Sequence, residues 1–115
     1  MRRLILALVL AGVLTAAALA IPALAATRSV RIGDNYFVRS HGVPTVIVRR
    51  GTVVRWAWKG RSIHNVTVVR GPVKFRSPTK RHGVFSVRVS RLGTYKIICT
   101  IHGASDQSMV LKVRR

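Results

Sequence analysis

Short runs rich in valine, isoleucine, threonine and aromatic residues recur after residue 26, and they constrain the fold more than any other feature. Glycine, proline and serine separate the runs, and no stretch repeats its apolar residues with a helical period. We therefore expect an all-β sandwich or barrel of about seven or eight strands. The expected strands cover 30–32, 36–38, 45–48, 53–58, 63–69, 84–89, 95–100 and 109–113, with a short edge strand at 73–75.

The first 25 residues predict a secretory signal peptide. Arginines at 2–3 precede an apolar stretch at 4–20, Pro22 interrupts it, and Ala23-Leu24-Ala25 has the small-x-small pattern of a cleavage site. We expect cleavage before Ala26. The alternative is an uncleaved membrane anchor, because the apolar stretch is only a little shorter than the ~20 residues of a membrane span.

Residues 26–115 are enough for one domain with one modest core. Removing Arg2 and Arg3 leaves 19 of the 21 basic residues against Asp34 and Asp106, a net charge of +17. Such a surface attracts polyanions. For an exported monomer we expect an acidic partner protein or an anionic cell-envelope surface, with possible peripheral membrane contact, rather than specific nucleic acid. The alternative is that the charges only keep a small domain soluble.

Cys99 is the single cysteine of the chain, so it cannot form an internal disulfide. Because a lone exposed thiol is vulnerable to oxidation outside the cytosol, Cys99 is expected to be either buried and inert or held as a metal ligand. Alternation along the strand puts Cys99 on the inward face with Tyr95 and Ile97. His102 follows in the next loop, and Met109 begins the next strand.

A thiolate, imidazoles and a thioether are the ligands of an electron-transfer copper site, which has two histidines, one cysteine and a weak axial methionine or glutamine. Three histidines could supply the second imidazole. His64 begins an apolar strand and is our choice, whereas His41 and His82 lie among glycine, arginine and serine in predicted turns and are expected to face solvent.

Five segments along the domain resemble those of the cupredoxins, the plastocyanin-like blue copper proteins. They are RIGDNYFV, IVRRGTVVRWAW, HNV, GTYKIICTIH with its Gly-x-Tyr-x-x-x-Cys-x-x-His spacing, and MVLKV. The resemblance implies a cupredoxin-like Greek-key β-sandwich that binds one copper ion at a type 1 site. It also implies single-electron transfer between envelope partners and no enzymatic activity. The alternative is an exported protein that carries or buffers copper without a redox partner.

By this resemblance His64, Cys99 and His102 are the strong copper ligands and Met109 is the axial one. The family pattern also implies that Asn65 braces the cysteine end and that the edge of His102 serves as the electron port.

The ligand loop departs from the family pattern. Six residues separate His102 from Met109 where the family usually has four, so Gln107 stands where the axial methionine falls by count. Both residue types can be axial ligands. We favour Met109, because a surface loop absorbs two extra residues at little cost.

Other interpretations of these residues are weaker. A cysteine–histidine enzyme needs a group that orients the histidine, and the sequence offers no clear candidate for it. A zinc site lacks a confident fourth ligand. Trp56 and Trp58 share one face of a strand and are expected to pack in the core, and the two carboxylates do not suggest an acid pair for glycoside chemistry.

Overall fold

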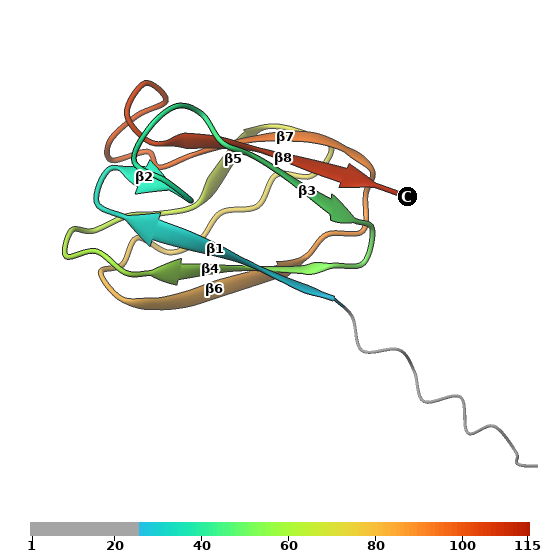
Figure 1. Cartoon of the computed structure of the whole chain (residues 1–115), viewed down its shortest axis with the longest axis horizontal. Coiled ribbons are helices and arrows are strands. Elements are labelled where there is room, and N and C mark those ends of the chain that lie inside the picture. Colours follow the sequence, from blue (N-terminus) through green and yellow to red (C-terminus); the bar gives the residue numbers. More distant parts are fainter. Residues whose placement is uncertain (1–25) are drawn as a thin grey trace, which may run out of the picture.

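Two four-stranded sheets face each other and form a β-sandwich (Figure 1). This computed structural model describes residues 26–115, so the predicted signal peptide at residues 1–25 lies outside the described residues. The strands of the described part are β1 (Thr27–Gly33), β2 (Tyr36–Phe37), β3 (Thr45–Arg49), β4 (Val53–Trp58), β5 (Thr67–Arg70), β6 (Gly83–Arg88), β7 (Gly93–Ile98) and β8 (Ser108–Arg114). The prediction of an all-β sandwich is confirmed.

Both sheets are mixed. One has the order β2-β1-β4-β6 and the other the order β3-β8-β7-β5. Strands β1 and β4 are parallel, as are β3 and β8, and the remaining pairs are antiparallel. Among the residues that the structure describes, there is no helix long and apolar enough to cross a membrane.

The core follows from alternation along the strands. In β3 the side chains of Val46 and Val48 are buried while their neighbours in the strand are exposed. Trp56 and Trp58 of β4 are buried, as predicted, and Trp56 contacts the rings of Phe75 and Phe85. Burial of large apolar side chains between the two sheets is the main stabilising contribution to such a fold.

The predicted strand at 63–69 is shorter in the structure, where β5 begins only at Thr67. Before it, the backbone is held by side chains and isolated bridges instead of a ladder. The Val66 N–H donates to the Ser77 hydroxyl at 2.8 Å, and His64 forms a single bridge with Lys80. The predicted edge strand at 73–75 is also absent from the described sheets, since Pro72 and Pro78 remove backbone donors on either side of it.

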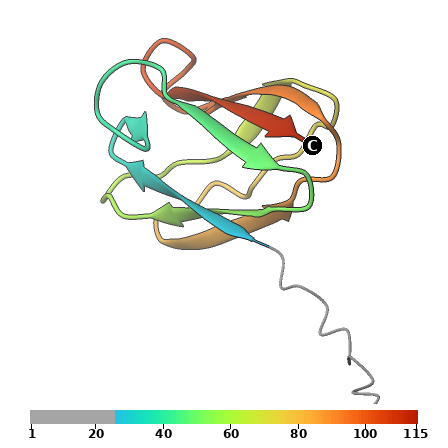
Figure 2. The same ribbon diagram turned by 45° about the vertical axis from the view of Figure 1, so that its right-hand side comes forward.

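The connections after β2, β4 and β7 lie at one end of the sandwich (Figure 2). Strand β7 ends there at Ile98 and β8 begins there at Ser108. We call this the site end. Strands β3, β6 and β8 finish at the opposite end, where β1 begins.

Candidate metal centre

Cys99 and His102 come together because the chain turns tightly after β7. The Cys99 N–H donates to the Gln107 carbonyl at 3.1 Å, and the Gly103 N–H donates back to the Cys99 carbonyl at 2.9 Å. Gly103 has a positive φ of 82°, which glycine adopts without steric cost. As a result, the Cys99 Sγ lies 3.5 Å from the His102 Nδ1. The thiol is fully buried and the imidazole is half-buried.

His64 lies near Cys99 and His102 as well, and it belongs to the connection between β4 and β5. Its backbone N–H and carbonyl exchange hydrogen bonds with Lys80, at 3.0 and 3.1 Å. The indole N–H of Trp58 donates to the His64 carbonyl at 3.1 Å. These bonds fix the backbone, and the ring is completely buried.

The ligand atoms of His64, Cys99 and His102 all lie within 4.8 Å of one another. Two imidazoles and one thiolate at this spacing can share one ion, and this donor set fits copper. His41 and His82 are exposed and stand apart from this group, as predicted. The rings of His64 and His102 have centroids only 4.9 Å apart, although 37 residues separate them in the sequence.

Gln107 lies directly beside Cys99. The β7–β8 register pairs Ile97 with Met109 and Ile98 with Ser108, so the next pair along is Cys99 with Gln107. Because side chains alternate, Gln107 and Met109 both point inward, and both are fully buried. Met109 is thus opposite Ile97. This pair lies farther from the site end than the pair of Cys99 and Gln107.

The polar atoms of Gln107 and His64 converge. Gln107 Oε1 lies 2.9 Å from His64 Nδ1, while the Gln107 amide N–H groups donate to the carbonyls of Tyr36 and Gly33 at 3.1 and 3.4 Å. These bonds assign the amide orientation. The other ring nitrogen, His64 Nε2, lies 3.2 Å from Asp34 Oδ1.

The hydrogen-bond network of His64 indicates where a cation fits. One ring nitrogen, Nε2, faces the Asp34 carboxylate, and the other, Nδ1, faces the Gln107 amide oxygen. Nδ1–H can donate to Gln107 Oε1, and when Nδ1 carries no proton the two atoms can both donate electron pairs to one cation.

Asp34 is a site residue that the sequence analysis missed. Its carboxylate accepts the Ser62 N–H at 2.9 Å and the Arg61 N–H at 2.9 and 3.1 Å. These backbone bonds, together with the His64 ring, lower the pKa of Asp34 from 3.8 to about 2. The available signal was that Asp34 is one of only two acidic residues and sits in a Gly-Asp-Asn turn.

Asn65 braces the cysteine end, as the family pattern implied. Its Oδ1 accepts the Thr100 N–H at 3.1 Å and the Thr67 hydroxyl at 2.8 Å. Its Nδ2 donates to the hydroxyls of Thr100 and Thr79, at 2.7 and 3.2 Å. A single buried side chain therefore ties the segment after His64 to the residue that follows Cys99. Such outer contacts orient metal ligands.

Comparisons with known proteins support the fold. No protein-family model matches the sequence, and no curated protein matches it. Among solved structures, the copper-containing nitrite reductase NirK of Thermus scotoductus aligns at a TM-score of 0.62 and 23% identity. The alignment covers 80% of this chain but only 23% of that one.

Two amicyanin structures, both in the Cu(I) form, align over most of their own length. A methionine-to-glutamine mutant has a TM-score of 0.60 and 24% identity, covering 76% of this chain and 82% of that one. A methionine-to-alanine mutant has a TM-score of 0.59 and 25% identity, covering 78% and 82%. The chain therefore has the β-sandwich fold of these copper proteins, with His64, Cys99 and His102 gathered at one end of the sandwich.

Proposed function

We propose that the protein is an exported type 1 copper protein that transfers single electrons between redox partners. The observation that carries this proposal is the meeting of His64, Cys99 and His102 at the site end of a cupredoxin fold. A copper ion held by this set supplies a one-electron couple and a thiolate-to-copper absorption band.

Cys99, His64 and His102 would each have a different role in such a site. Cys99 is buried, so its thiolate is kept from water and oxidants. His64 is held at both ring nitrogens and gives a fixed direction for one bond. His102 is half-buried and next to the exposed Ile101, so its edge can meet a partner. We propose this edge as the electron port.

For the axial position we propose Gln107. Its Oε1 lies against His64 Nδ1, and its backbone pairs with Cys99, which supports a position next to the other ligands. Met109, the axial ligand predicted from the sequence, is the competing residue. Both side chains are buried, so exposure does not separate them.

Adding Cu(II) to the metal-free protein tests the function. Wild type should develop strong visible thiolate-to-copper absorption at one ion per chain, and Cys99→Ser should not. Wild type without this band would exclude the proposed site. A blue protein that exchanges electrons slowly with acidic electron carriers would instead support copper carriage or buffering.

Two further variants test the axial residue. They are measured after Cu(II) loading has produced the visible absorption band. Gln107→Leu should alter the electron paramagnetic resonance spectrum and raise the reduction potential, because it removes an oxygen donor. Met109→Leu nearly conserves volume and should leave both readouts unchanged. The opposite result would assign the axial position to Met109 and leave the electron-transfer function intact.

The charge of the domain also suggests how a redox partner is found. With a net charge of +17 after leader removal, encounter with an acidic partner should be fast and should slow as salt screens the attraction. Stopped-flow reduction by an acidic carrier at several ionic strengths measures this effect. A rate independent of salt would contradict charge steering.

A further inference from the structure

Arginine side chains gather at the end of the sandwich opposite the site. We call this the basic end and define it by seven exposed residues: Arg28, Arg49, Arg50, Arg88, Arg91, Arg114 and Arg115. Strand β8 runs from Ser108 at the site end to Arg114, a length of about 20 Å at ~3.3 Å per residue. The two ends are therefore separate surfaces.

Strand pairing brings the arginines of one sheet together. Arg49 of β3 pairs with Arg114 at the end of β8. The Arg50 N–H donates to the Arg114 carbonyl at 2.6 Å, which places the next arginine on the same edge. Arg115 follows directly, so four arginines lie at the ends of two adjacent strands.

The other sheet contributes Arg28 and Arg88, and Arg91 lies in the connection from β6 to β7. Arg88 at the end of β6 pairs with Val53 at the start of β4, and Val53 pairs with Thr27, the neighbour of Arg28. The Gly51 N–H donates to the Val89 carbonyl at 2.7 Å and links the two sheets here. The arginines thus surround a whole end of the molecule instead of forming a stripe on one face.

The two acidic side chains of the chain lie elsewhere. Asp34 contacts His64, and Asp106 lies in the loop after His102, so both are at the site end. Neither can neutralise the arginines at the basic end. The seven arginines of the basic end therefore have no acidic side chain among them, and their positive charge attracts an anionic surface.

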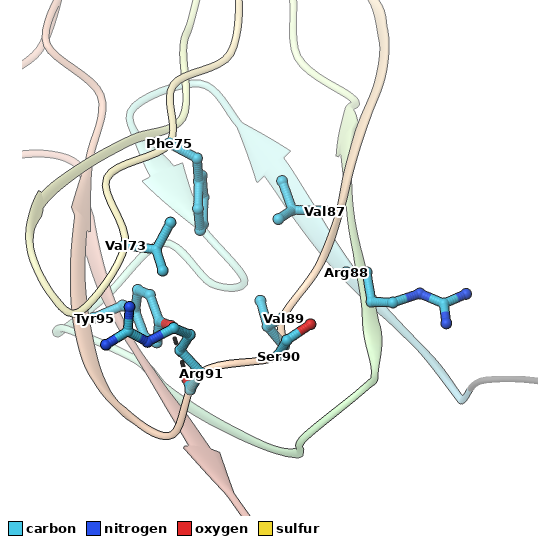
Figure 3. A pocket seen from close by; sticks show the side chains of 8 residues that line it. All are labelled: Val73, Phe75, Val87, Arg88, Val89, Ser90, Arg91 and Tyr95. Carbon is cyan, nitrogen blue, oxygen red and sulfur yellow. Dashed lines mark hydrogen bonds between the residues drawn. The ribbon is translucent and has the colours of Figure 1, made fainter.

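Apolar features accompany the arginines. Leu92 is exposed beside Arg91 in the connection from β6 to β7. A pocket of about 220 Å³ opens nearby between the sheets, with Val73, Phe75, Val87, Val89 and Tyr95 on its walls (Figure 3). Arg88, Ser90 and Arg91 complete its lining. An apolar recess with arginines beside it suits a molecule that has both an acyl chain and an anionic headgroup.

We propose that the basic end binds the surface of a bilayer rich in anionic lipid and leaves the site end pointing away from it. A bilayer fits better than a single acidic protein, because the charges surround an entire end and stand beside exposed apolar groups. This inference goes beyond the proposed function and holds whether or not copper is bound.

Vesicle binding by residues 26–115, which contain both sheets, tests the proposal. Metal-free protein is sedimented with vesicles of phosphatidylcholine alone or mixed with phosphatidylglycerol, after circular dichroism has verified that each variant is folded. Wild type should bind the mixed vesicles only, and more weakly at high salt. The triple variant Arg49→Gln, Arg50→Gln, Arg114→Gln should bind about 100-fold more weakly, since each arginine near an anionic membrane contributes roughly a factor of five.

A matched control separates location from net charge. Arg39→Gln, Lys59→Gln, Arg61→Gln removes three exposed charges at the site end and should bind within a few-fold of wild type. Equal weakening by both triple variants would overturn the proposal, as would an absence of binding to the mixed vesicles. Equally tight binding to soluble polyglutamate would also overturn it and would identify an acidic polymer or protein as the partner.

Discussion

The two imidazoles of the site are held in opposite ways. His64 is completely buried, with Asp34 at one ring nitrogen and Gln107 at the other. His102 is half-buried on a loop, and its Nδ1 lies against the Cys99 sulfur. Their ring centroids are nevertheless only 4.9 Å apart.

This difference separates two requirements of the proposed electron-transfer site. A buried, doubly held ring fixes one ligand direction whether or not a metal is present, and it resists water. A ring on a surface loop gives the site its contact with the outside. The comparison predicts that substitutions of His64 mainly change the stability of the fold. Substitutions of His102 should mainly change how easily solvent and small molecules reach the site.

The largest expected effect comes from His64→Ala. The variant leaves a cavity and removes a buried partner of Gln107 and Asp34, so the free energy of unfolding of the metal-free protein should fall by about 3 kcal/mol. Urea unfolding monitored by tryptophan fluorescence measures it. A loss no larger than that of His102→Ala would contradict the asymmetry.

Asn65→Ala should destabilise the metal-free protein by about 2 kcal/mol, because the Thr100 N–H and the Thr67 hydroxyl lose the buried oxygen that accepts from both. The loop that carries His102 should loosen as well, so faster hydrogen exchange at residues 100–103 is expected. Thr79→Ala, which removes only one of the Asn65 contacts, is the milder control. Exchange unchanged in Asn65→Ala would show that the loop does not depend on this brace.

Asp34→Asn should raise the reduction potential of the copper-loaded protein by roughly 60 mV, a tenfold change in the ratio of Cu(II) to Cu(I) affinity. The carboxylate makes the His64 ring a stronger electron donor, which favours the oxidised ion. Asp106→Asn removes the same charge from the loop after His102 and should shift the potential less. Equal shifts would mean that the charge acts at long range and not through the His64 ring.

The smallest expected effect on stability is that of His102→Gly, below about 1 kcal/mol, since the ring is half-buried and outside the strands. Free imidazole should restore the visible band in this variant, because its position opens to solvent. Imidazole should not restore the band in His64→Gly, whose position is closed. Rescue of both variants would remove the distinction between a closed and an open ligand.

Local pattern predicted much of the molecule. Strand β4 was expected at its observed bounds, and Cys99 was placed on the inward face with Tyr95 and Ile97, because alternation along a strand depends only on neighbouring residues. His64 was preferred over His41 and His82 because of its apolar surroundings, and the structure places His64 beside Cys99 and His102. The strand expected around His64 was wrong, since Ser77 and Lys80, distant in sequence, satisfy the backbone there.

The sequence by itself determined the sandwich and the types of ligand, since apolar alternation and the choice of cysteine and histidine are properties of single residues and their neighbours. Only the tertiary structure decided that Asp34 would hold His64, that Gln107 would pair with Cys99, and that the arginines would collect at the other end. These features depend on strand register and on which connections share an end of the sandwich. Strand register and sheet order depend on how the whole chain packs, so they cannot be predicted from any one segment.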